Sequence, residues 1–261
     1  MQRRAYVSGL VLLATLVTGC SAGSGGSDSE SGAKTNTVQP AAAPPPGKYR
    51  TLPEACGAVD RGLLKDMLPV SPDLPEEERE KVYAGTAALT YDTDRRVGCN
   101  WKAESPDATR RLVVDFERVV SYDAAMSDEG RAQEVYAKKQ AAAGLPVTTS
   151  TSTPGDSQAP TAPPVTPPSG ADSTTPPQPA EGLEPRVLDN LGDAAFLNDV
   201  PAGAGSVTQG RTVSVVFRTS NVIVTVQYTV QPALPTVVPD SGELQEKARA
   251  LAGRLAEQFG E

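Results

Sequence analysis

The chain contains no histidine, which limits the chemistry that its side chains could perform. Pairs of serine or cysteine with a histidine base are excluded, and so are the imidazole ligands usual for zinc. Carboxylates remain, and Asp115 and Glu117 stand two apart on an expected strand, where they share a face. Two acids at a suitable separation suffice for glycoside hydrolysis. We interpret this pair as the wet side of a strand and predict no catalytic residue, no metal site and no cofactor.

Three short motifs match known signatures but lie in the wrong context. Residues 19–23 match a nucleophile-elbow string that no helix follows, and residues 31–34 spell Ser-x-x-Lys in a polar segment without its partner motifs. Asp92-Thr93-Asp94 begins like a calcium loop, but Arg96 and Ala103 stand where oxygen ligands belong. We assign no function to any of the three.

Cys20 follows a short basic stretch and an apolar run, the layout of an export signal. The run covers residues 6–17, whereas a hydrocarbon core needs about 20 apolar residues. Val17-Thr18-Gly19-Cys20 resembles the lipobox of bacterial lipoproteins. We therefore expect residues 1–19 to be a signal peptide and Cys20 to carry a diacylglyceryl anchor, with an ordinary secretory signal as the alternative. The membrane partner is then covalent lipid, on the extracytoplasmic face of the cell membrane. Arg3-Arg4 leaves general and twin-arginine export both open.

Cys56 and Cys99 are the only other cysteines. In an exported chain we predict that they form a disulfide bond, with two buried free thiols as the alternative. Closing this loop would stabilise the fold by roughly 4 kcal/mol in the chain-entropy model.

The chain is acidic, with 24 Lys and Arg against 32 Asp and Glu. Such a field repels nucleic acid and anionic head groups, so we expect no nucleic-acid partner.

Composition marks two expected disordered segments and one domain after the expected signal peptide. Residues 20–47 are rich in Ser, Gly, Ala and Pro without any aromatic residue, and we expect a disordered tether with a random-coil reach of about 30 Å. Residues 148–180 consist mostly of Ser, Thr and Pro, which predicts a disordered insertion. We expect residues 48–261 to form one domain that this insertion interrupts, with two independent lobes as the alternative.

Two stretches of this domain have the periodicity of secondary structure. In the first, Asp60 is placed to cap a helix through Leu68, the acidic run at residues 76–80 reads as a solvated loop, and a helix is expected over residues 124–142. Strands are expected in this stretch at residues 86–91, 97–102 and 111–119.

The second stretch repeats this order of strands followed by a helix. Its clearest feature is a hairpin of residues 211–218 and 221–230, in which Val213, Val215 and Phe217 share a face with alternate residues from Val222 to Tyr228. Asp240 with Glu243 then forms a capping box before a helix with an apolar stripe from Leu244 to Phe259. The two pseudo-repeats predict an α+β fold, an antiparallel sheet with helices on one face.

Three motifs carry a resemblance to a known family: Pro53-Glu54-Ala55-Cys56 before a short helix, Cys99-Asn100-Trp101 on a strand, and Leu191-Gly192-Asp193-Ala194 before the valine-rich hairpin. With them, most of residues 49–259 resembles the actinobacterial lipoprotein family named domain of unknown function 3558. The Thr/Pro-rich insertion is not a feature of every member. The resemblance implies an extracytoplasmic lipoprotein and supports the pairing of Cys56 with Cys99, but it transfers no catalytic residue.

These observations favour a lipid-anchored, non-enzymatic envelope lipoprotein that binds a protein partner or a small amphipathic ligand. Trp101, Tyr122, Tyr136 and Tyr228 could line a pocket, although buried aromatics more often belong to the core. The alternatives are a cell-wall hydrolase that uses paired carboxylates and a solute-binding component of a transporter. The strand-rich order disfavours the transporter component, whose lobes are usually of parallel α/β type.

Overall fold

The computed structural model describes residues 44–147, 183–201 and 209–260. The expected signal peptide 1–19, the lipidation site Cys20, most of the expected tether and the insertion 148–180 lie outside the described residues. Within the described ranges, no helix has both the length and the apolar character needed to cross a membrane.

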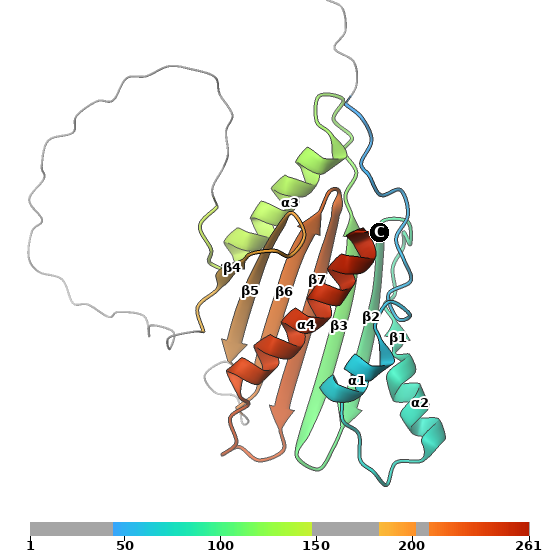
Figure 1. The fold of residues 1–261 in the computed structure, drawn as a ribbon, viewed down its shortest axis with the longest axis vertical. Helices are drawn as coiled ribbons and strands as arrows, with labels where there is room; N and C mark the ends of the chain where they lie inside the picture. The colour runs from blue at the N-terminus through green and yellow to red at the C-terminus, as the bar shows by residue number, and fades with distance from the viewer. Residues whose placement is uncertain (1–43, 148–182, 202–208, 261) are drawn as a thin grey trace, which may run out of the picture. The chain divides into compact units, whose positions relative to one another are not determined.

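A seven-stranded antiparallel sheet forms the centre of the domain, with its strands in the order β1-β2-β3-β7-β6-β5-β4 (Figure 1). The α+β class predicted from the sequence is confirmed. Along the chain the elements are α1 (Arg61–Met67), α2 (Glu76–Ala84), β1 (Thr86–Ala87), β2 (Arg96–Glu104), β3 (Ala108–Arg118), α3 (Asp128–Ala142), β4 (Arg186–Leu188), β5 (Ala194–Pro201), β6 (Arg211–Thr219), β7 (Val222–Pro232) and α4 (Ser241–Gly260).

The two halves of the chain meet at the centre of this sheet. All eleven residues of β3 pair with β7, from Ala108 opposite Pro232 to Arg118 opposite Val222. The first half supplies β1 to β3 and the second supplies β4 to β7, so the strands follow the repeated order expected from the sequence. The two halves therefore contribute to a single sheet.

The β6–β7 hairpin forms as its alternating pattern predicts. Thr219 pairs with Val222 across a turn of Ser220 and Asn221, and Ser220 has the positive φ of 48° that such short hairpin turns require. The residues expected on one face, from Val213 to Phe217 and from Val222 to Tyr228, are all buried in the larger core.

The larger core lies between the sheet and α4. Asp240 accepts a hydrogen bond from the Glu243 amide at 2.7 Å, as the capping motif predicts. The apolar stripe of the helix, from Leu244 to Phe259, packs on β6 and β7. Helix α1 adds Leu64 and Met67 to the same core, and Asp60 caps it as expected.

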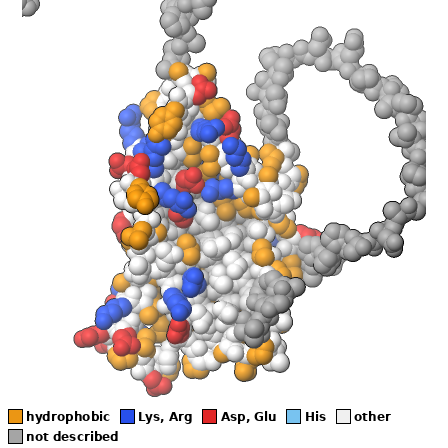
Figure 2. Space-filling view, turned by 180° about the vertical axis from the view of Figure 1, so that it is seen from behind, with side chains coloured by type: hydrophobic (Ala, Val, Ile, Leu, Met, Phe, Trp, Pro, Cys, Tyr) orange, Lys and Arg blue, Asp and Glu red, His pale blue; other side chains and the backbone are white. Residues whose placement is uncertain are grey.

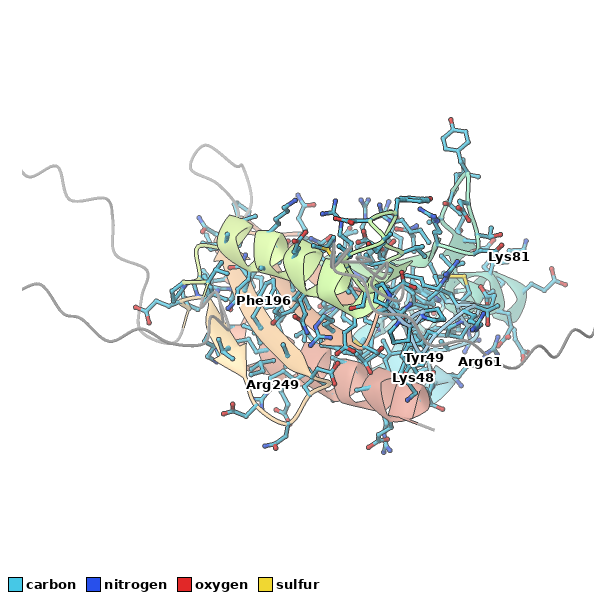
Figure 3. All side chains as sticks on the ribbon, turned by 90° about the horizontal axis from the view of Figure 1, so that it is seen from above. Lys48, Tyr49, Arg61, Lys81, Phe196 and Arg249 are labelled. Atoms are coloured by element: carbon cyan, nitrogen blue, oxygen red, sulfur yellow. A yellow bond between two sulfur atoms is a disulfide. The ribbon has the colours of Figure 1, made fainter. Side chains whose placement is uncertain are left out.

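Helix α3 corrects the expectation that the helices cover a single face. Figure 3 shows the sheet between α3 and α4. Ala132 and Tyr136 of α3 pack on Phe196, Val216 and Ile223. These three alternate along their strands with residues of the larger core, so they point to the opposite face. The helices that end the two repeats, α3 and α4, are therefore not equivalent, because they pack on opposite faces of the sheet. On the larger-core side of the first half, α1 and α2 take the place that α4 has in the second half.

The acidic run at residues 76–80 is the second correction, because it forms helix α2 and not a loop. Pro75 precedes the helix, and Glu76, Glu77 and Glu78 occupy its first turn, where negative charge interacts favourably with the helix dipole. Only Tyr83 of this helix is buried, which explains why the run has no apolar periodicity.

The domain also begins earlier than expected. Gly47, which we assigned to the tether, donates its amide proton to Asp128 at 3.0 Å. Tyr49 then donates its amide proton to the buried Asn221 at 2.9 Å, so the segment from Gly47 to Tyr49 is fixed to the turn of the β6–β7 hairpin. Two strands differ as well: β1 has two residues in place of six, and β4 was not expected.

Cys56 and Cys99 form the predicted disulfide bond, with their Cα atoms 5.1 Å apart. The bond ties the segment before α1 to β2, beside the buried indole of Trp101. Gly85 makes this packing possible. Its φ is +71°, and a Cβ there would lie 2.6 Å from the Cys99 sulfur and 2.5 Å from the indole nitrogen of Trp101.

Candidate functional site

The face of the sheet opposite the larger core is covered by α3 only in part. Beyond α3, this face is polar, and no described helix or strand packs over that part of β2, β3 and β7. We call this surface the open face. Along each strand its residues alternate with residues of the larger core, so their side chains point to the other side of the sheet. Figure 2 shows the domain from this side, with a broad uncharged area bordered by clusters of charged side chains. The outward residues that define the open face are Asn100, Lys102, Arg111, Val113, Asp115, Thr225, Gln227 and Thr229.

One hollow of about 520 Å³ lies on the open face between α3 and the loop that follows β1. Asn100, Thr225 and Gln227 are among the floor residues, and Lys139 of α3 stands at one side. At the opposite side the loop presents Leu89 and Tyr91, both fully exposed. Fully exposed large apolar side chains beside a polar hollow are typical of a contact surface.

Asp115 and Glu117 lie on this face, as the sequence predicts, but each is bound by a cation. The Asp115 carboxylate accepts from Arg96 Nε at 2.7 Å, and this hydrogen bond raises the pKa of the Arg96 guanidinium. Glu117 lies 3.1 Å from Lys139 Nζ. We therefore assign the pair a structural role.

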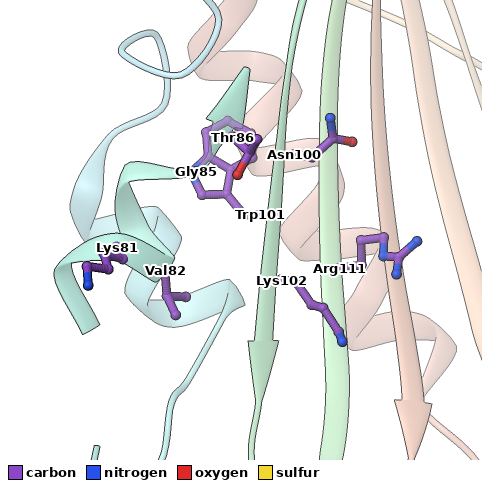
Figure 4. A pocket seen from close by; sticks show the side chains of 8 residues that line it. All are labelled: Lys81, Val82, Gly85, Thr86, Asn100, Trp101, Lys102 and Arg111. Carbon is purple, nitrogen blue, oxygen red and sulfur yellow. The ribbon is translucent and has the colours of Figure 1, made fainter. Parts of the chain in front are cut away.

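A second hollow of about 360 Å³ opens at the edge of the sheet, between α2 and β2 (Figure 4). Asn100 lines both hollows, so they adjoin, and we call the two together the groove. Lys102 and Arg111 extend from neighbouring strands at one side of this second hollow, and Lys81 lies on α2 at the other (Figure 4).

A third hollow, of about 300 Å³, lies on the α4 side and is more apolar. Leu234, Val237 and Val238 line it and are partly exposed. Tyr228 lies at its inner end and donates its hydroxyl proton to the Met67 carbonyl at 2.6 Å. Burial raises the pKa of this hydroxyl to about 12. At the rim, the hydrogen bond from Arg110 to Asp107 lowers the pKa of that carboxyl to about 2.

The four aromatic residues singled out in the sequence do not gather at one site. Trp101, Tyr136 and Tyr228 are buried, as most such aromatics are, while Tyr122 is 84% exposed. Arg95 stacks over the Tyr122 ring at 4.9 Å and donates a hydrogen bond to its hydroxyl. Trp101 and Tyr228 each reach the wall of a different hollow.

Sequence reasoning missed the groove as a site. Its floor is made of outward residues from three strands, and only their pairing brings Asn100, Thr225 and Gln227 together. Of the site residues that were predicted, Cys56 and Cys99 are joined, whereas Cys20 lies outside the described residues. Across the described ranges, no group of three or more Cys, Asp or Glu residues is placed to hold a metal ion.

Comparisons with known proteins add no relative to this geometry. No family model matches the chain, no curated protein matches its sequence, and no solved structure matches its fold.

Proposed function

We propose that this chain is a lipid-anchored, extracytoplasmic lipoprotein that acts as a non-enzymatic binding module and contacts its partner through the open face. The observation that carries the proposal is the groove on β2, β3 and β7, which is bordered by Lys81 of α2 and Lys139 of α3. A soluble sheet usually packs a helix or a second sheet on each apolar face, and here the uncovered part is polar and hollowed. Its position makes it available to a partner.

The residues beside the groove fit binding better than catalysis. Leu89 and Tyr91 offer apolar surface at the rim, while Asn100 and Gln227 offer amide donors and acceptors on the floor. The carboxylates that a hydrolase would need are each bound to a cation. A binding module needs only the donors, acceptors and apolar rim that are present.

The anchor is the second part of the proposal. Residues 1–19 have the layout of an export signal, and the lipobox-like Val17-Thr18-Gly19-Cys20 supplies the thiol for a thioether-linked lipid. Two or three acyl chains anchor a protein durably, since each buried methylene contributes about 0.8 kcal/mol. The disulfide between Cys56 and Cys99 agrees with export to an oxidising compartment. Membership of the domain of unknown function 3558 family remains part of this proposal.

Cell fractionation tests the anchor. The wild-type chain should partition with membranes and incorporate a labelled fatty acid, and Cys20→Ser should lose the label and leave the membrane fraction. Cys56→Ser, which removes a cysteine of the disulfide and not the lipidation site, should retain the label. Unlabelled wild-type protein in the soluble fraction would refute the anchor.

The hydrolase alternative is tested on the same exported protein. Asp115→Ala, Glu117→Ala and the double variant should leave any wall-degrading activity of the preparation unchanged. A loss of activity that follows these carboxylates, with Asp94→Ala as the exposed control, would favour the hydrolase.

A further inference from the structure

Lys102 and Arg111 stand directly opposite each other on β2 and β3. Both side chains point to solvent on the open face, and like charges in opposite positions of an antiparallel pair lower stability. Lys102 is compensated, because Glu104 lies 2.5 Å from its ammonium group and the resulting hydrogen bond lowers the pKa of that carboxyl. Arg111 has no acidic partner within the described part of the chain. Fold stability therefore gives no account of this arginine.

The Lys102–Glu104 pair supplies the charged neighbours of Arg111 on β2, and its remaining cross-strand neighbours are polar and uncharged. Its other neighbour in the sheet is Thr229 of β7, and the next outward residue of that strand is Gln227. On the β2 side the next outward residue is Asn100, which lines both hollows of the groove. A free guanidinium fork thus lies beside two amides and a hydroxyl. Figure 4 shows Arg111, Lys102 and Asn100 on the same side of the second hollow.

We propose that this groove binds an acidic glycan, a sugar chain that carries carboxylate groups. Arg111 and Lys102 would bind a carboxylate, since a guanidinium pairs with a carboxylate through two parallel hydrogen bonds. Asn100 and Gln227, which line the groove, would exchange hydrogen bonds with sugar hydroxyls. This inference rests on the proposed use of the open face as a binding surface and adds the class of ligand.

Charge and polarity distinguish this ligand from the other anionic partners. The whole chain has a net charge of −8, which opposes the many simultaneous contacts that a nucleic acid or an anionic bilayer needs. A sugar chain with isolated carboxylates needs a cationic side chain only at the positions where its carboxylates bind. The hydroxyl groups of a sugar can also form hydrogen bonds with the amides and hydroxyls of the groove floor. An acyl chain would bury these polar groups without hydrogen-bond partners.

Calorimetric titration of the full mature lipoprotein in a non-ionic detergent tests the proposal. The probes are a galacturonate oligosaccharide, a neutral glucose oligosaccharide of equal length, and inorganic phosphate. We expect binding of the galacturonate that weakens as salt is added, no binding of the neutral chain, and at most weak competition by phosphate. Equal binding of both oligosaccharides, binding of neither, or phosphate binding as tight as that of galacturonate would overturn the proposal.

Charge-removing variants place the ligand on the groove. Arg111→Gln should weaken galacturonate binding about tenfold, the size expected for one lost charge-assisted contact. Lys102→Gln should weaken it as well, whereas Arg249→Gln on the outer side of α4 should have no effect. Thermal unfolding provides the folding control, because Arg111→Gln removes a repulsion and should not lower the melting temperature. Unchanged binding in Arg111→Gln would contradict the assignment.

Failure of the ligand class can be separated from failure of the binding surface. If galacturonate does not bind but probes on the open face still crosslink to an envelope component in cells, the acidic glycan is wrong and the surface stands. If both fail, the proposed function fails with it.

Discussion

Asp199 on β5 accepts a hydrogen bond from Arg211 on β6 at 2.7 Å, and their side chains are 0% and 8% exposed. The other carboxylate oxygen of Asp199 accepts from Ser241 and, at 2.8 Å, from Gln245, which both lie in the first turns of α4. This buried cluster therefore fixes the start of the helix to the sheet.

Removing one member of the buried pair should destabilise the domain strongly. Asp199→Ala leaves the Arg211 charge without its partner, and we expect a loss of about 3 to 5 kcal/mol in the free energy of unfolding. Glu80→Ala is the control, since the Arg61–Glu80 pair is about half exposed and should contribute less than about 1 kcal/mol. Urea unfolding of both variants measures the difference, and equal effects would show that the buried pair has no special role.

The disulfide should make a large contribution to stability. It closes a loop across 43 positions, so replacing Cys56 and Cys99 together by Ala should cost about 2 to 5 kcal/mol. Unreduced exported protein should show no alkylation at either cysteine by mass spectrometry. Reduction should lower the melting temperature of the wild type and leave that of the double variant unchanged. Alkylation of both thiols without reduction would contradict the bond.

Cleavage within residues 148–180 should leave the two halves of the domain associated. The reason is the ladder between β3 and β7, which joins the halves along all eleven residues of β3. Limited proteolysis followed by size exclusion without denaturant should give one peak that contains both fragments. Their separation under native conditions would mean that the central pairing is wrong.

Stability should fall at high pH because of Tyr228. Burial raises the pKa of its hydroxyl from 10.0 to about 12, so the folded state holds this proton where the unfolded chain has already lost it. The stabilisation is complete below pH 10 and disappears as the pH rises through about 12, a change of about 2 to 3 kcal/mol. Chemical unfolding across this range should show the decline. Tyr228→Phe should show less of it, and an identical decline would exclude Tyr228 as its cause.

The strands and α4 could be predicted because their residues carry a clear periodicity. Val213, Val215 and Phe217 alternate with polar residues, and a slip by one position would expose them all. The same hairpin carries a further signal. Val216 and Ile223 are apolar although they occupy positions on the face opposite the larger core, so the alternation with polar residues is broken there. Apolar residues on both sides of a strand are expected where both faces of the sheet are covered. The two residues indicate where α3 packs.

The placement of α2 and α3 could not be predicted from the same pattern. Helix α3 buries only Ala132 and Tyr136, and α2 buries only Tyr83, so neither sequence has a distinct apolar stripe. The groove was hidden for a different reason. Its residues look like the ordinary wet side of separate strands, and their proximity follows from the β3–β7 pairing across more than a hundred residues of sequence.

The central claim is that the open face is the contact surface of the anchored protein. Site-specific photo-crosslinking in living cells tests it most directly, with the probe at Gln227 on the open face or at Glu246 on the exposed side of α4. Both positions are exposed, and each variant retains Cys20. The account predicts an adduct from Gln227 and none from Glu246. Adducts of equal yield from both positions, or from Glu246 alone, would contradict it.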